Sequence, residues 1–303
     1  MSVMRPILNV WLRYTEKPHL ARATDPDKLR RSFETKARFY FRGPRGTIYA
    51  PGTIAGVPVV TVAAPGAQDS DGPLILYLHG GAYVFGSPKT HQAMLAQLSA
   101  RTGLRACLPE YRKAPEHPFP AAVEDAVAVY TELAQHPGGI ILGGDSAGGG
   151  LVLALLQEIA RLGLPSPLGC LCLSPLTDFS FSTPSVTRNA KSDVVLPVSM
   201  VPLMTEMVMQ DRALDDPLIS PLRGDFTNAP PVWICVGDTE ILEDNARLMA
   251  ERLENQGVET TLVIENDLPH VWPLFHNLLP EARATLDQMA GWITSLPRRS
   301  TDS

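Results

Sequence analysis

A single serine stands among five glycines in the segment GGDSAGGG, residues 143–150. Inside regular structure each glycine costs roughly 0.5–1 kcal/mol relative to alanine, so such a cluster indicates a tight turn, a phosphate-binding loop or a linker. The segment follows the apolar run GIIL and precedes AGGGLVLALLQEIARLG, which has the pattern of a helix. Gly144, Ser146 and Gly148 therefore match G-x-S-x-G at a strand-to-helix turn, a geometry that projects a reactive hydroxyl above a sheet.

One other interpretation of the cluster remains open from the motif alone, and a third is excluded. Ser146 could cap the following helix in a glycine-rich turn that has no chemistry. A phosphate loop would need a lysine directly after the glycines, and none is present; the G-x-G-x-x-G spacing is also absent. The start of a helix favours negative charge, which suits a serine that becomes part of an oxyanion.

A second glycine-containing loop, HGGAYVFG (79–86), follows the apolar run that ends at residue 78. We expect the amides of Gly80 and Gly81 to bind the oxygen of a reacting carbonyl, together with the amide of Ala147 beside the serine. We expect His79 to hold this loop through hydrogen bonds and to take no part in the chemistry.

A serine nucleophile also needs a base and a carboxylate that orients the base. In hydrolases with G-x-S-x-G, the carboxylate and then the histidine follow the serine along the chain. His270 stands in ENDLPHVWPLF, just past the last predicted strand, and is the expected base. The turn after VWICV offers Asp238 and Glu240, and the turn alone does not decide between these two carboxylates.

The elements that must position these groups alternate between strands and helices. Continuous apolar runs predict strands that are buried on both faces, and the helical patterns lie between them. The expected strands are 47–50, 57–63, 73–78, 104–108, 139–144, 168–174, 231–237 and 259–265, and the expected helices are 90–101, 120–135, 147–162, 242–256 and 280–295. This alternation predicts an α/β fold with a mostly parallel, eight-stranded sheet covered by helices.

Two segments fall outside the alternation. Residues 1–45 are amphipathic and predict one or two helices, broken near TDPDK, and residues 179–217 are inserted between two predicted strands, with a helical, methionine-rich part around 198–210. We expect both segments to form a helical cap over the carboxyl edge of the sheet. The hydrolase core would then comprise residues 46–178 and 218–298.

The composition excludes several classes of protein. The chain has 303 residues, of which 45% are hydrophobic and 19% charged, and a net charge of −6, so we expect a globular protein without nucleic-acid partners. We recognise neither a signal-peptide core nor an 18-residue apolar span, and therefore expect a cytoplasmic protein without stable membrane insertion. The cysteines stand in apolar runs without metal-ligand spacing, which predicts buried thiols: Cys107, Cys170, Cys172 and Cys235.

The motifs together resemble the hormone-sensitive-lipase-like family of α/β-hydrolase carboxylesterases. The matching pieces lie within about residues 75–295 and are HGGAYVFGS (79–87), YRKAPEHPFPAAVEDA (111–126), GGDSAGGGLVLAL (143–155), LSPLTD (173–178), DPLISPL (216–222) and DLPHVW (267–272). The resemblance implies an α/β-hydrolase fold in which Ser146 is the nucleophile and His270 the base. Where the family usually has Asp-Pro-Leu-x-Asp, this chain begins with Glu240, which the resemblance implies as the acid, with Asp238 in reserve.

The resemblance further implies a serine esterase that works through an acyl-enzyme, and we expect no metal or cofactor because every step is proton transfer and electrostatics. A small pocket with an apolar lining favours short to medium acyl esters. A lipase, an amidase or a lactonase would use the same triad, and a non-catalytic small-molecule receptor on the same fold is the alternative outside enzymes. A homodimer is common in such proteins. The expected pocket residues, some of which could equally be cap core, are Tyr83, Val84, Phe85, Leu203, Met204, Met207 and Val271. We expect Asp145 to bond to the YRKAPEHPFP segment and Asp178 to be structural.

Overall fold

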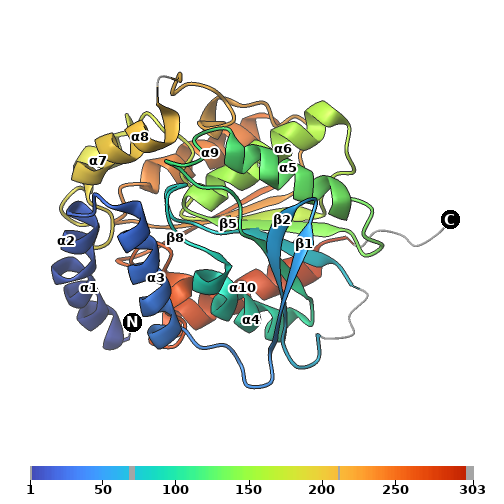
Figure 1. Ribbon diagram of the computed structural model, residues 1–303, viewed down its shortest axis with the longest axis horizontal. Helices are drawn as coiled ribbons and strands as arrows, with labels where there is room; N and C mark the ends of the chain where they lie inside the picture. Colours follow the sequence, from blue (N-terminus) through green and yellow to red (C-terminus); the bar gives the residue numbers. More distant parts are fainter. Residues whose placement is uncertain (1, 68–71, 211, 298–303) are drawn as a thin grey trace.

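The computed structural model describes residues 2–67, 72–210 and 212–297 (Figure 1). Met1, residues 68–71, Asp211 and residue 298 fall within the predicted segments 1–45, 46–178, 179–217 and 218–298 but lie outside the described residues.

A single mixed sheet forms the centre of the protein, with the strand order β1-β2-β4-β3-β5-β6-β7-β8. β1 and β2 pair antiparallel, as do β2 and β4, and all other neighbours are parallel, which confirms the expected mostly parallel, eight-stranded sheet. The strands are β1 (Ile48–Ile54), β2 (Val57–Ala63), β3 (Leu74–Leu78), β4 (Ala106–Pro109), β5 (Ile140–Asp145), β6 (Gly169–Leu173), β7 (Val232–Gly237) and β8 (Thr260–Glu265).

The pairing register brings the functional loops to one edge of the sheet. Leu78 of β3 pairs with Gly144 of β5, and Leu173 of β6 pairs with both Asp145 and Cys235. Because these strands are parallel, the loops that leave them at their carboxyl ends start at a common level. Ligands in open α/β sheets bind at this edge.

Helices cover both faces of the sheet (Figure 1). One layer consists of α5 (Ala121–Leu133), α6 (Ala147–Leu162) and α9 (Glu243–Asn255), and the other of α4 (Pro88–Thr102) and α10 (Pro280–Ser295). Each layer buries an apolar cluster against the sheet; Leu151 of α6 and Leu95 of α4 are both fully buried. Helices on both faces explain why the inner parallel strands β3 and β6 are apolar and buried along their whole length, whereas the edge strand β8 is only partly buried.

Three helices precede the sheet: α1 (Met4–Tyr14), α2 (Glu16–Ala21) and α3 (Pro26–Tyr40). The expected break near TDPDK is present, since Asp25 caps α3 by accepting the Lys28 amide at 3.0 Å. The expectation of one or two helices is wrong, because Thr15, with φ −115°, interrupts the first segment between α1 and α2.

The insertion after β6 holds α7 (Pro184–Arg188), the 3₁₀ turn η1 (Val198–Met200) and α8 (Val201–Met209), and two further 3₁₀ turns are η2 (Pro221–Arg223) and η3 (Trp272–Phe275). In Figure 1 the insertion lies beside α1–α3. Lys17 of α2 joins the two segments by donating to the carbonyl of Ala190 at 2.8 Å. None of the described helices combines the length and apolar character that a bilayer span requires.

Candidate active site

Ser146 occupies a strained turn between β5 and α6. Its φ of 53° and ψ of −124° are unusual for a residue other than glycine, and such conformations cost of order 1–3 kcal/mol unless the surroundings enforce them. Its amide donates to the Leu173 carbonyl at 2.8 Å. A Cβ at Gly144 would lie 2.3 Å from the Gly148 carbonyl oxygen, and one at Gly148 would lie 2.0 Å from the Leu78 oxygen. The glycines of G-x-S-x-G are therefore required by close backbone contacts.

His270 and Glu240 form a buried pair at the same edge. His270 Nδ1 lies 2.5 Å from Glu240 Oε2, and Glu240 Oε1 accepts the Gly237 amide at 2.7 Å and the Ser174 hydroxyl at 2.8 Å. Glu240 is 1% exposed and His270 is 8% exposed. Burial lowers the pKa of His270, but the charge and hydrogen bond of Glu240 act in the opposite direction, and the net pKa is raised above the ordinary value.

Asp238, the other candidate acid, turns away from His270. Its side chain accepts the amide of Asp267 at 2.7 Å and the side-chain amide of Asn266 at 2.8 Å, so it braces the loop after β8. Of the two carboxylates that the sequence left open, Glu240 is the one in contact with His270.

The Gly80 amide is not free, which corrects the expectation for this residue. It donates to Asp145 Oδ1 at 3.0 Å, so it cannot also bind a substrate oxygen. The next two residues, Gly81 and Ala82, have φ values of 126° and 53° and line the same cavity as Ser146. Among the described residues, their amides and that of Ala147 donate to no protein acceptor, and all three stand beside the nucleophile.

Asp145 holds the loop after β3, and the expectation that it bonds to the YRKAPEHPFP segment is wrong. Besides the Gly80 amide, it accepts the Tyr77 hydroxyl at 2.9 Å, and His91 Nε2 lies 3.1 Å from its Oδ1. His79, expected to be structural, bonds through Nδ1 to the Gly80 carbonyl at 2.9 Å. Burial lowers the pKa of His79 well below its ordinary value, which keeps its ring neutral.

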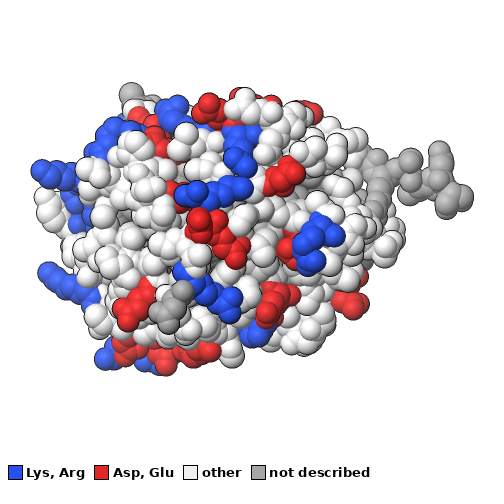
Figure 2. All heavy atoms as spheres, turned by 90° about the horizontal axis from the view of Figure 1, so that it is seen from above, with Lys and Arg blue, Asp and Glu red and all other residues white. Residues whose placement is uncertain are grey.

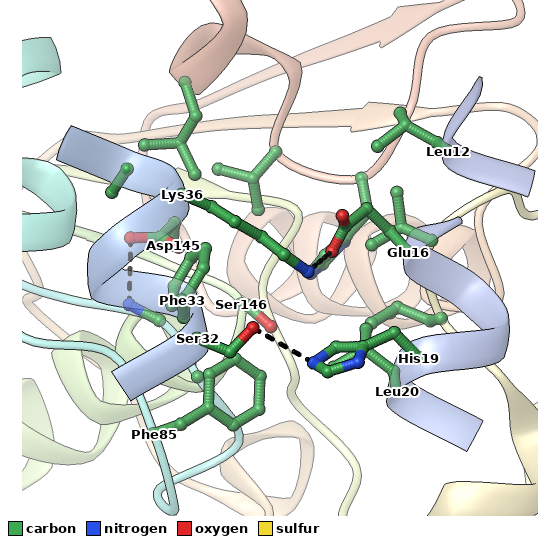
Figure 3. Close-up of a pocket in the computed structure, with 18 of the residues that line it drawn as sticks. Leu12, Glu16, His19, Leu20, Ser32, Phe33, Lys36, Phe85, Asp145 and Ser146 are labelled. Carbon is green, nitrogen blue, oxygen red and sulfur yellow. Dashed lines mark hydrogen bonds and ion pairs between the residues drawn. The ribbon is translucent and has the colours of Figure 1, made fainter. Parts of the chain in front are cut away.

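A large cavity opens above Ser146, and Figure 3 shows its wall of residues from α1, α2 and α3. Apolar side chains dominate this wall, with two polar pairs among them: Lys36 and Glu16 at 2.7 Å, and Ser32 and His19 at 3.2 Å. The apolar lining residues include Trp11, Leu12, Leu29, Phe33, Ala37, Tyr40, Phe41, Phe85, Leu196, Val271, Leu274 and Phe275. A second, smaller cavity extends from Ser146 and Ala82 towards Phe179, Met200 and Met204.

Only part of the predicted pocket lines these cavities. Phe85 and Val271 line the large cavity, and Met204 lines the small one. Four expected residues line neither: Tyr83, Val84, Leu203 and Met207. The Tyr83 ring packs against Phe179 and Val84 lies fully in the core. On α8, Met204 and Val208 face inward, so Leu203 and Met207 fall on the flanks of the helix.

The face of α3 is the largest contribution that residue-by-residue sequence reasoning missed. The lining residues of α3 recur at helical spacing: Leu29, Ser32, Phe33, Lys36, Ala37 and Tyr40. This i, i+3, i+4, i+7 pattern was readable in the sequence, but a single chain does not reveal whether such a face covers a core or a cavity. Within the described ranges, no cluster of three or more His, Cys, Asp or Glu side chains is arranged to hold a metal ion.

The sheet topology and the serine turn define the class of protein as an α/β hydrolase, and the family model described by that fold matches residues 75–274. An acetyl-hydrolase of Streptomyces hygroscopicus is 37% identical over 240 residues, which cover 78% of this chain and 80% of that protein. An esterase of Acinetobacter venetianus is 31% identical over 275 residues, covering 89% of each chain.

Solved structures narrow the assignment. The crystal structure of an esterase from the bacterial hormone-sensitive lipase family matches with a TM-score of 0.91 and 36% identity, covering 98% of this chain and 99% of the other. The chain belongs to the hormone-sensitive-lipase-like family of α/β-hydrolase carboxylesterases and is a carboxylic-ester hydrolase.

Proposed function

We propose that Ser146, His270 and Glu240 are the catalytic triad of this esterase and that catalysis passes through an acyl-enzyme. The observation that supports the proposal most strongly is the 2.5 Å contact between His270 Nδ1 and Glu240 Oε2, beside a strained serine that lines the same cavity as His270. The contact fixes the proton on Nδ1 and leaves Nε2 to accept a proton from Ser146.

The reaction then follows from these positions. Ser146 Oγ attacks the ester carbonyl carbon while its proton passes to His270 Nε2, and the tetrahedral intermediate expels the alcohol, which takes that proton. Water repeats the sequence on the acyl-enzyme and releases the acid. Within the described chain Ser146 Oγ has no hydrogen-bond partner, which agrees with a nucleophile–base bond that tightens on substrate binding.

We assign the oxyanion hole to the amides of Gly81, Ala82 and Ala147, in place of Gly80. Each of these amides lacks a protein acceptor among the described residues and belongs to a residue adjoining the nucleophile or its cavity. One such donor contributes roughly 3–4 kcal/mol to the stability of the transition state. Gly80 acts indirectly, because its bond to Asp145 fixes the start of the loop.

We further propose that the acyl group occupies the small cavity and the alcohol the large one. The small cavity measures about 50 Å³ against about 140 Å³ for the large one, and its apolar end is closed by Phe179, Met200 and Met204. These dimensions favour short to medium acyl chains. Crystals of a related esterase, 34% identical with a TM-score of 0.89, were soaked with p-nitrophenyl butyrate, an ester with a short acyl chain.

The wider features of the protein are also proposals. We infer that residues 1–45 and 179–217 form a cap on a core of residues 46–178 and 218–298, because both segments cover the serine cavity. A homodimer would pair the β8 edges, since β8 ends the sheet. A reducing, cytoplasmic location agrees with four buried free thiols, and the face in Figure 2 intersperses basic with acidic side chains, unlike a nucleic-acid-binding stripe.

Hydrolysis of p-nitrophenyl acetate and butyrate tests the proposed triad. We expect activity in the wild type and at least a thousandfold lower kcat in Ser146→Ala, with the thermal unfolding curve retained as a control for folding. Equal activity of the two proteins would refute Ser146 as the nucleophile. An inactive wild type would favour the non-catalytic receptor instead.

A further inference from the structure

Side chains of the insertion after β6 bind the backbone of the turn that carries Glu240. Asn189 donates through Nδ2 to the carbonyl of Glu240 at 2.7 Å, and Ser185 Oγ donates to the carbonyl of Ile241 at 2.7 Å. Asp193 Oδ2 accepts the amide of Ile241 at 2.9 Å. The residue that follows the acid is thus anchored through both its carbonyl and its amide by side chains of the insertion.

Asp193 is an unusual member of this set because it is a buried carboxylate. It is 2% exposed, and its Oδ1 accepts the amides of Val195 and Leu196, each at 2.8 Å. Lys17 donates to its backbone carbonyl at 2.6 Å, and the positive charge of Lys17 also interacts with the Asp193 carboxylate without a direct hydrogen bond between the two side chains among the described residues. Burial raises the pKa of Asp193, while His270 and the amide donors act against that rise. Burying a carboxylate is costly, and the amides of Val195, Leu196 and Ile241 offset part of that cost.

We propose that Asp193 is a positioning residue for the reaction: it fixes the Glu240 turn and supplies a second buried negative charge that stabilises the protonated form of His270. This inference rests on the proposed triad and extends it. The imidazolium forms when Ser146 loses its proton, in a site where burial opposes positive charge.

The charges around His270 favour this role. Glu240 is in direct contact, and Asp193 from the insertion and Asp145 from β5 both act to raise the pKa of His270. The cap helices bring two more charged side chains to the same cavity, Lys36 and Glu16, but these neutralise each other in an ion pair at 2.7 Å. The carboxylates therefore act together in favour of the protonated imidazole, and Asp193 is the one that the insertion supplies.

The N-terminal helices bind the backbone on either side of Asp193 and so fix its position. Lys17 of α2 donates to the carbonyls of Ala190 and Asp193, and Arg13 of α1 donates to those of Lys191 and Ser192. The same helices contribute to the wall of the substrate cavity. The helices that enclose the substrate thus also fix the segment that anchors the acid.

The test compares Asp193→Asn with Asp178→Asn, a matched control. Asp178 is also buried, at 4% exposed, and holds a turn by accepting the Ser180 amide at 3.1 Å and its hydroxyl at 2.6 Å, but it contacts none of the triad. The rate of p-nitrophenyl butyrate hydrolysis is measured from about pH 5 to pH 9, and circular dichroism and thermal unfolding establish that each variant is folded.

Removing the charge makes the imidazolium less stable, so the pKa of His270 falls and the neutral base persists to lower pH. We expect the acidic limb of kcat/KM in Asp193→Asn to move down by about half a unit or more. We expect kcat at the plateau to fall about tenfold, because Asn offers only one acceptor oxygen to anchor the turn. Asp178→Asn should keep the wild-type limb.

An unchanged limb in folded Asp193→Asn, or an upward shift, overturns the proposal and leaves Asp193 a structural residue. If Asp193→Asn does not fold, Asp193→Glu is measured instead; it keeps the charge, and we expect it to retain the wild-type acidic limb of kcat/KM. A shifted acidic limb in Asp193→Glu, or failure of both variants to fold, also overturns the proposal. The proposed triad fails separately, by a wild type without activity or an active Ser146→Ala.

Discussion

The substitution Glu240→Gln tests the assignment of the triad acid. Glutamine keeps the shape of the side chain and an oxygen that can accept the Gly237 amide and the Ser174 hydroxyl. It removes the negative charge 2.5 Å from His270 Nδ1. Its amide group can also donate to Nδ1, which would place the imidazole proton on Nε2 and block the nitrogen that must accept the serine proton.

The expected loss follows from the burial of the pair. Unit charges about 4 Å apart attract by about 4 kcal/mol at the effective dielectric constant of about 20 that suits protein sites. Since roughly 1.4 kcal/mol is tenfold in rate, losing this stabilisation of the imidazolium lowers kcat by about a thousandfold. The wrong tautomer adds to this, and a comparable amide substitution in a serine protease lowers kcat about ten-thousandfold.

The assay is the initial rate of p-nitrophenyl butyrate hydrolysis at saturating substrate, with Asp238→Asn as the matched control. Asp238 belongs to the same turn, but among the described residues its side chain bonds only to Asn266 and Asp267. We expect its substitution to change kcat by less than about threefold, since it removes no contact with the base. A larger loss in Asp238→Asn than in Glu240→Gln would refute the assignment of Glu240 and restore Asp238 as the acid.

Three further outcomes are expected. Met204→Trp closes the end of the small cavity, so the ratio of kcat/KM for the butyrate ester to kcat/KM for the acetate ester should fall about tenfold, since each buried methylene contributes about 0.8 kcal/mol. An unchanged ratio would refute the assignment of the small cavity to the acyl group. Ser146→Gly removes the backbone strain of a residue held at φ 53°, so it should raise the free energy of unfolding by about 1 kcal/mol while abolishing hydrolysis. A variant with a lower free energy of unfolding would contradict the strain. In the wild type, kcat/KM should fall as the pH drops through a His270 pKa above its ordinary value, and a midpoint below about 6.5 would contradict that direction.

The sequence predicted the central elements closely because their patterns are local. Helices α6 and α10 have the expected bounds, 147–162 and 280–295, each set by a sharp start at the serine turn or at Pro280. β1 was expected to end at residue 50 because Pro51 and Gly52 follow, yet it runs to Ile54. It is an edge strand, where proline and glycine are tolerated, and an edge position is not visible in a single sequence.

Site residues were predictable where a motif fixes the backbone, and less predictable where contacts with residues distant in the sequence determine their role. The positions of Ser146 and His270 follow from strand ends, whereas the use of the Gly80 amide depends on Asp145, 65 residues away. Asp193 had no recognisable signal, because its importance comes from contact with a turn 48 residues further on. Which side of α8 faces a cavity also depended on packing that periodicity does not specify.

Covalent labelling with a p-nitrophenyl phosphonate ester tests whether Ser146 is the nucleophile. We expect one phosphonyl group per molecule on the peptide that contains Ser146, loss of activity in proportion to labelling, and no labelling of Ser146→Ala. In a crystal structure of the adduct, the phosphonyl oxygen should lie within hydrogen-bond distance of the Gly81, Ala82 and Ala147 amides. Labelling of another residue, or full activity after Ser146 is modified, would show that Ser146 is not the nucleophile.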